Sequence, residues 1–142
     1  MTIVIDASVA AKWFIEEEDS DAAAALLGGG ESLIAPDLLA AEVCNIVATK
    51  LRRGEANPEQ IVESMQTLPQ FIDDFASCVV LARRALQIAR ILAHPAYDCF
   101  YLALAELMKC QVVTADQRFL ARIEATEWEA VVMRLGAEPI EC

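Results

Sequence analysis

The chain lacks most of the residue groups that define common catalytic and metal-binding sites. It contains a single histidine, His94, and no Cys-x-x-Cys pair among its five cysteines. A Cys/His zinc cluster and a nuclease that needs two histidines are therefore excluded. The sequence has neither a G-x-S-x-G nucleophile elbow nor a glycine-rich phosphate loop ending in G-K-[ST]. After Asp6, the sequence Ala7-Ser8 lacks the second aspartate of phosphatases that form an aspartyl-phosphate.

Long apolar runs and an excess of positive charge are also missing. No segment reaches the ~18–20 consecutive apolar residues of a membrane span. The first apolar run has no basic segment before it, so we expect no signal peptide and a cytoplasmic protein. The net charge of −11 argues against a broad basic face that binds nucleic acid non-specifically. It does not exclude a nuclease, because a bound divalent metal neutralises several carboxylates.

The length and composition favour one domain with a sizeable core. The 142 residues contain no repeat or low-complexity linker, so we expect a single domain over residues 1–142. Hydrophobic residues make up 56% of the chain, which predicts that some apolar surface is buried against a partner. The cysteines are odd in number and scattered, which favours reduced core cysteines over disulfides. They are Cys44, Cys78, Cys99, Cys110 and Cys142.

Hydrophobic periodicity predicts strands that alternate with helices. The expected strands are residues 2–5, 32–34, 111–114 and 130–133, with an ambiguous segment at 71–75. The first expected helix begins at Ser8, and the others cover residues 21–27, 36–53, 58–68, 79–92, 97–109 and 117–123. This alternation predicts an α/β fold with a parallel sheet between two layers of helices. Ligands bind such sheets at the carboxyl ends of the strands.

Four acidic residues end or interrupt apolar segments: Asp6, Glu42, Asp98 and Asp116. Asp6 and Asp116 each come just after a predicted strand. Buried carboxylates cost several kcal/mol unless they are paired or bind a metal, so the four predict one shared cation site. Hard oxygen ligands suit Mg²⁺ or Mn²⁺, and such ions activate water against phosphodiesters. The pattern therefore indicates metal-assisted phosphodiester hydrolysis.

Each acid also has a structural alternative. Asp6 and Asp116 are each placed to cap a following helix. Glu42 lies on a partly polar stripe and is placed to reach solvent, while Asp98 lies in a first helical turn that the helix dipole favours for an acid.

Other polar residues near the acids have possible supporting roles. Thr114 is placed to donate a hydrogen bond to a carboxylate or a bound water. Arg118 is the best candidate for a phosphate contact among the basic residues near the acids, the others being Lys12, Arg52 and Arg53. The alternative for Arg118 is a solvated charge on the helix surface.

Four segments resemble, in order, the motifs of PIN-domain proteins, especially VapC-type toxins of toxin–antitoxin pairs. The first is V-I-D-A-S-V-A-A-K-W-F at residues 4–14, and the second is P-D-L-L-A-A-E-V-C-N at 36–45. The third is Y-D-C-F-Y-L-A-L-A-E at residues 97–106, and the fourth is V-T-A-D-Q-R-F at 113–119. Cys99 stands where a small residue is common. Each motif is weak alone, but four in order over nearly the whole chain form a specific pattern.

The resemblance implies an α/β/α sandwich and an endoribonuclease that depends on Mg²⁺ or Mn²⁺. It places Asp6, Glu42, Asp98 and Asp116 in the metal site, and it assigns supporting hydroxyls to Ser8 and Thr114. It also implies a homodimer and inhibition by a small cognate antitoxin. Two alternatives stay open: a non-catalytic PIN-like module that binds protein or RNA, and a metal-dependent DNA nuclease.

Overall fold

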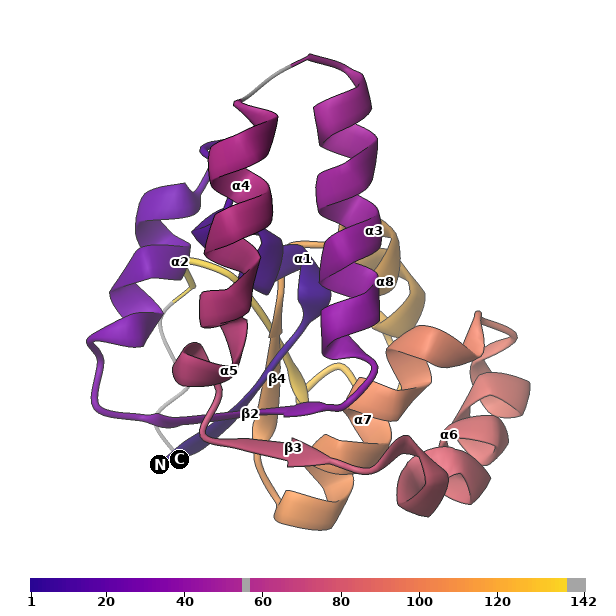
Figure 1. The fold of residues 1–142 in the computed structure, drawn as a ribbon. Coiled ribbons are helices and arrows are strands. Elements are labelled where there is room, and N and C mark those ends of the chain that lie inside the picture. The colour runs from indigo at the N-terminus through magenta and orange to yellow at the C-terminus, as the bar shows by residue number, and fades with distance from the viewer. Residues whose placement is uncertain (55–56, 138–142) are drawn as a thin grey trace.

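A parallel sheet forms the centre of the computed structural model, which describes residues 1–54 and 57–137 (Figure 1). Its strands are β1 (Thr2–Ile5), β2 (Ser32–Pro36), β3 (Asp74–Ala76), β4 (Gln111–Thr114) and β5 (Val132–Arg134). They lie in the order β3-β2-β1-β4-β5, and all neighbours are parallel. Val4 of β1 aligns with Ile34 and Val112, so β-branched side chains fill the centre of the sheet.

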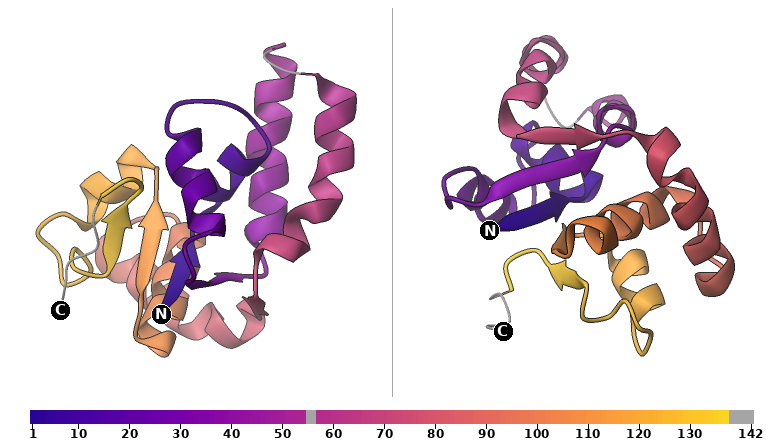
Figure 2. Two further views of the ribbon diagram at one scale, coloured as in Figure 1. Left: turned by 90° about the vertical axis from the view of Figure 1, so that its left-hand side faces the viewer. Right: turned by 90° about the horizontal axis from the view of Figure 1, so that it is seen from below.

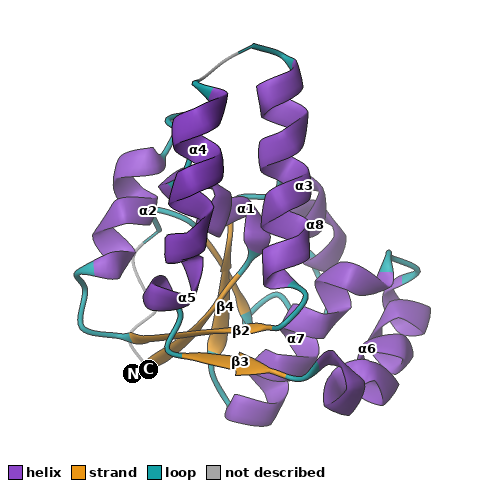
Figure 3. Ribbon diagram, in the orientation of Figure 1, coloured by secondary structure: helices purple, strands orange, loops and turns teal. Residues whose placement is uncertain are grey.

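Helices cover both faces of this sheet, as the second view of Figure 2 and the helix colouring of Figure 3 show. One layer contains α1 (Ala7–Ala10), α2 (Ser20–Leu27), α3 (Leu39–Arg52), α4 (Pro58–Ser64), α5 (Leu68–Phe71) and the short 3₁₀ turns Ala11–Trp13 and Met65–Thr67. The other layer contains α6 (Cys78–Leu92), α7 (Ala96–Met108) and α8 (Gln117–Ile123). The predicted three-layer α/β/α arrangement is confirmed. In the described part of the chain, no helix is long and apolar enough to cross a bilayer.

The strand order creates a switch point between β1 and β4. The chain runs outward from β1 through β2 to β3, then returns to β4 on the other side of β1. The helices that follow β1 and β4 therefore lie on opposite faces, which opens a crevice at the carboxyl ends of these two strands. Asp6 and Asp116 follow these ends directly, so the sheet brings them to the same edge.

The most deeply buried helix is α7, which packs across β1, β2 and β4 and against α6. Cys99 and residues 101–105 are buried, as expected for a segment that is apolar on all sides. Pro95 precedes the helix, and Lys109 ends it in the left-handed conformation with φ of 53°. The first turn of α7 carries Asp98, whose charge raises the pKa of Asp6, so this end of the helix lies near the carboxyl end of β1.

Glu106, farther along α7, connects three parts of the fold. Its carboxylate accepts hydrogen bonds from Arg84 Nε and Nη2 at 2.6 and 2.9 Å, and from Trp128 Nε1 at 2.9 Å. We expect Glu106→Ala to lower the free energy of unfolding by about 1–2 kcal/mol, because buried Trp128 and half-exposed Arg84 lose their acceptor. Urea denaturation measures this change. Glu106→Gln keeps one acceptor and should lose less, and an unchanged midpoint for the alanine variant would contradict the role.

Several predicted boundaries are wrong. Strand β2 extends to Pro36 because Ala35 and Pro36 pair with β3, so α3 begins at Leu39 and not at residue 36. The predicted helix over 58–68 divides into α4, a 3₁₀ turn and α5, where Pro69 provides no backbone N–H. The ambiguous segment 71–75 contains the end of α5, and β3 covers 74–76. The last strand is 132–134 and not 130–133.

The cysteine prediction is correct in part. Four described cysteines are free thiols, but only Cys99 is buried. Cys44 is exposed, because the buried face of α3 carries Leu39, Val43 and Val47. Cys142 lies outside the described residues.

Candidate metal centre

Asp6 lies at the carboxyl end of β1, where its backbone N–H donates to Val113 O at 3.1 Å. It is only 4% exposed. Its Oδ2 atom accepts hydrogen bonds from Ser8 N at 3.3 Å, from Ser8 Oγ at 2.5 Å and from Thr114 Oγ1 at 2.9 Å. Asp6 therefore caps α1 as one interpretation predicts, and the two expected hydroxyls hold the same carboxylate.

Burial raises the pKa of Asp6 to about 6. The hydrogen bonds from Ser8 and Thr114 oppose this rise, whereas the negative charge of Asp98 adds to it. A carboxylate that only caps a helix at the surface would not have its pKa raised by burial. The polar surroundings of Asp6 thus stabilise its charged form only in part, and a positive charge would complete that stabilisation.

Glu42 lies in the first turn of α3 and is half-buried. Its Oε1 atom accepts a hydrogen bond of 2.7 Å from the hydroxyl of buried Tyr101. Burial, together with the charges of Asp6, Asp98 and Asp116, raises the pKa of Glu42 to about 7, and the hydrogen bond from Tyr101 opposes this rise. Glu42 is thus not a simple solvent-facing glutamate, since three other acids affect its protonation.

Asp98 lies in the first turn of α7. Its Oδ2 atom is 2.5 Å from Nε2 of His94, which lies just before the helix, and the His94 ring stacks against Phe119 with centroids 6.0 Å apart. Burial raises the pKa of Asp98, His94 opposes this shift, and the charge of Asp116 adds to it. His94 therefore orients one oxygen of Asp98 and leaves the other directed elsewhere.

Asp116 caps α8, as one interpretation predicts. Its Oδ1 atom accepts hydrogen bonds from Arg118 N at 2.9 Å and Phe119 N at 3.3 Å. It nonetheless raises the pKa values of Glu42 and Asp98, so it lies within electrostatic range of both. The side chain of Arg118 is exposed, and none of the described arginines forms an ion pair with the four acids.

The donor set fits a hard divalent cation. Each of the four carboxylates has one oxygen held by a protein donor, and the other accepts no hydrogen bond from the described residues. Since no buried side-chain oxygen in that part of the chain lacks a partner, the second oxygen of Asp6 reaches the surface. Among the described residues, however, no three His, Cys, Asp or Glu side chains converge into a ready-made metal cluster. The arrangement is therefore a group of mutually repelling acids with available oxygens.

Three residues of this region escaped the sequence analysis: Tyr101, His94 and Lys50. Tyr101 follows Asp98 by three residues within α7, a helical spacing that places side chains on one face, and this spacing was a readable signal. His94 lies before α7, so no helical spacing predicted its contact with Asp98. Lys50 lines a hollow with Ser8 and Lys12, and both lysines form ion pairs with Glu17. No sequence pattern indicated that α3 contacts the segment after α1.

Comparison with known proteins agrees with this geometry. The family model described as PIN domain matches residues 3–125, a range that includes all four acids. The chain is also 28% identical over 127 residues to the ribonuclease VapC3 of Pyrobaculum aerophilum. The alignment covers 88% of this chain and 97% of that relative.

Proposed function

Because the chain belongs to the PIN domain family, we propose that it is a metal-dependent endoribonuclease and the toxin of a toxin–antitoxin pair. The observation that carries the proposal is the electrostatic coupling of Asp6, Glu42 and Asp98 in the crevice between β1 and β4, with Asp116 at its edge. The name of the VapC3 relative supports RNA as the substrate. We also propose that residues 1–142 form one domain.

The four carboxylates are proposed to hold Mg²⁺ or Mn²⁺ through the oxygens that no protein donor occupies. The bound cation supplies positive charge that lowers the pKa of a water molecule and offsets charge on the phosphodiester. The chain's own residues set up the site. Ser8 and Thr114 fix Asp6, while His94 fixes Asp98. Tyr101 fixes Glu42, and its hydrogen bond favours the charged form of that carboxylate.

The substrate phosphates need positive charge close to these acids. Arg118 remains a possible phosphate contact, since it follows Asp116 by two residues and its side chain is exposed. The hollow beside Ser8 offers a second position, because Lys12 and Lys50 line it, together with Glu17 and Glu18. Glu17 holds both lysines in place. Two lysines beside the hydroxyl that binds Asp6 would keep a phosphate near the acids.

The proposed protein partners are a second copy of the chain and a small cognate antitoxin. Support comes from the similarity to VapC3 and from large apolar side chains that stay exposed, among them Val79 and Val80 on α6. An acidic surface with a net charge of −11 also suits a basic protein partner. Burial of these apolar side chains would explain the high hydrophobic content.

The proposal is tested by incubating a mixed RNA pool with the purified protein in Mn²⁺, in Mg²⁺ or in EDTA. We expect cleavage with either metal and none in EDTA, because the acids repel one another without a cation. A matched single-stranded DNA pool separates a ribonuclease from a DNA nuclease. Cleavage in EDTA would contradict metal dependence. No cleavage of either pool, with no heat of metal binding in calorimetry, would leave the non-catalytic binding module.

A further inference from the structure

Tyr97 is an aromatic side chain with no structural partner among the described residues. It is 65% exposed at the start of α7, whereas the rest of that helix is mostly buried. No hydrogen bond or ring contact to it occurs in the described part of the chain. It lines a hollow of about 350 Å³ with Ala41, Glu42, Asn45 and Ile46 of α3. The residue that follows it is Asp98, so the ring lies at the border of the candidate metal centre.

A second hollow, of about 330 Å³, lies farther along α3. Ile46 lines both hollows, while Lys12 and Lys50 line only the second. Residues 42, 46 and 50 follow each other at four-residue spacing, so they form one stripe along α3. Glu42 belongs to the first hollow and Ser8, which binds Asp6, to the second. A ligand that occupies both hollows therefore contacts Glu42 in one and Ser8, the partner of Asp6, in the other.

The two hollows differ in charge. The Tyr97 hollow contains one acid and no cationic side chain among the residues that line it, so a phosphate is disfavoured there. A neutral, planar group is favoured, because it can lie on the ring without repulsion from Glu42 and can hydrogen-bond to the Asn45 amide. The second hollow is lined by Glu17 and Glu18 as well as by Lys12 and Lys50, so its side chains carry no net charge. Its two ammonium groups are the donors there that can hold a phosphate.

We propose that Tyr97 is a stacking platform for a nucleobase of single-stranded RNA, with the backbone of the same strand held on the side of Lys12 and Lys50. This inference rests on the proposed function and adds the form of its substrate. Bases stack on aromatic side chains with little sequence preference. A base within a duplex is already stacked and paired, so only an unpaired nucleotide can reach the ring. An RNA strand bound in this way has a base on Tyr97 and a phosphate beside Lys12 and Lys50, and the segment between them lies near the acids.

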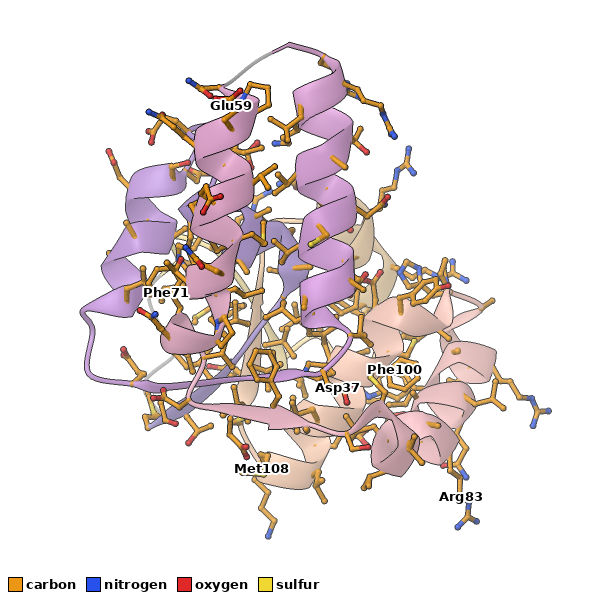
Figure 4. All side chains as sticks on the ribbon, in the orientation of Figure 1. Asp37, Glu59, Phe71, Arg83, Phe100 and Met108 are labelled. Carbon is orange, nitrogen blue, oxygen red and sulfur yellow. The ribbon has the colours of Figure 1, made fainter. Side chains whose placement is uncertain are left out.

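The test measures binding of two fluorescent probes: a short single-stranded RNA and a ribose-phosphate strand of the same length without bases. All proteins carry Asp6→Asn to prevent cutting. Adding Tyr97→Ala should weaken binding of the RNA roughly fivefold to a hundredfold and leave the base-free strand unchanged. Tyr97→Phe keeps the ring and should bind nearly as the parent does. Leu107→Ala is the matched control, since Leu107 is 62% exposed in the last turn of α7. Figure 4 labels the next residue, Met108, at that end of the helix.

The inference is overturned if Tyr97→Ala weakens both probes equally or neither. If Tyr97→Ala binds the RNA as tightly as its parent, the exposed ring is assigned to contact with a protein partner instead. Cleavage assays of the single variants with functional Asp6 separate this result from the proposed activity. Full cleavage by Tyr97→Ala would leave the ribonuclease proposal intact and remove the base site. A wild-type protein that cuts no RNA, but whose binding still depends on both the base and the ring, would keep the base site and remove the activity.

Discussion

Replacing Asp6 by asparagine is expected to lower metal-dependent RNA cleavage by about a thousandfold while the fold stays intact. A bound metal contributes several kcal/mol of transition-state stabilisation, and each 1.4 kcal/mol corresponds to about a tenfold change in rate. Asparagine has nearly the same size as aspartate, and its amide oxygen can still accept the hydrogen bonds from Ser8 and Thr114. It can also still cap α1. The substitution therefore removes the ligand charge and little else.

Stability measurements separate this effect from unfolding. Without metal, Asp6→Asn should be as stable as the wild-type protein or more stable, because it removes a buried charge among other acids. The wild-type protein should melt at a higher temperature when Mn²⁺ is added, and the variant should lose that increase. Glu63→Gln is the control, since it removes one negative charge from an exposed position of α4 outside the acidic group. A variant that keeps full activity after identical purification would contradict the shared site.

The parts of the fold that the sequence predicts best are those where local pattern and tertiary packing agree. Strands β1 and β4 and helix α8 have the predicted bounds, because short β-branched runs lie in the centre of the sheet and a capping aspartate begins the helix. The same reasoning placed Asp6 and Asp116 at one edge. Parallel strands bring their carboxyl ends together whatever the side chains are, so this juxtaposition follows from the strand assignment alone.

Asp37 shows why other boundaries failed. An acid just after Pro36 fits the first turn of a helix, and the helix dipole would favour it there. In the structure, however, Asp37 Oδ1 accepts a hydrogen bond of 3.1 Å from Cys78 N, at the start of α6. The residue thus serves a helix that lies 41 positions later in the chain. Local pattern contains no information about such a contact, and β2 extends to Pro36 for the same reason.

The candidate site divides in a similar way. The four acids were found because carboxylates are unusual in apolar segments. Tyr101 and the lysine hollow were not found, since a tyrosine in an apolar helix and a lysine on a surface helix are both ordinary. Their roles depend on how α7 and α3 pack around the crevice. The resemblance to PIN-domain proteins, which the family match confirms, points to the same four acids but not to Tyr101 or the lysines.

Metal-free protein should lose stability as the pH rises from about 4 to about 7. Burial raises the pKa of Asp6 from 3.8 to about 6 in the folded state, so the folded protein keeps a proton that the unfolded chain has already lost. Stability from this group is complete below pH 4 and is lost as the pH passes 6. The loss from Asp6 alone amounts to at most about 3 kcal/mol. Glu42, with a pKa of about 7, extends the same trend upward.

Urea denaturation in EDTA between pH 4 and pH 8 measures this loss, and Asp6→Asn isolates the share of Asp6. The variant is needed because some acids act in the opposite direction: Arg84, for example, lowers the pKa of Glu106, whose contribution is lost on acidification. The difference in stability between the two proteins should therefore grow with pH in favour of the variant. Mn²⁺ should reverse that order above pH 6, since a cation binds the deprotonated carboxylates. Parallel curves for the two proteins in EDTA would mean that Asp6 is solvated like a surface carboxylate, and the electrostatic argument for a cation would then fail.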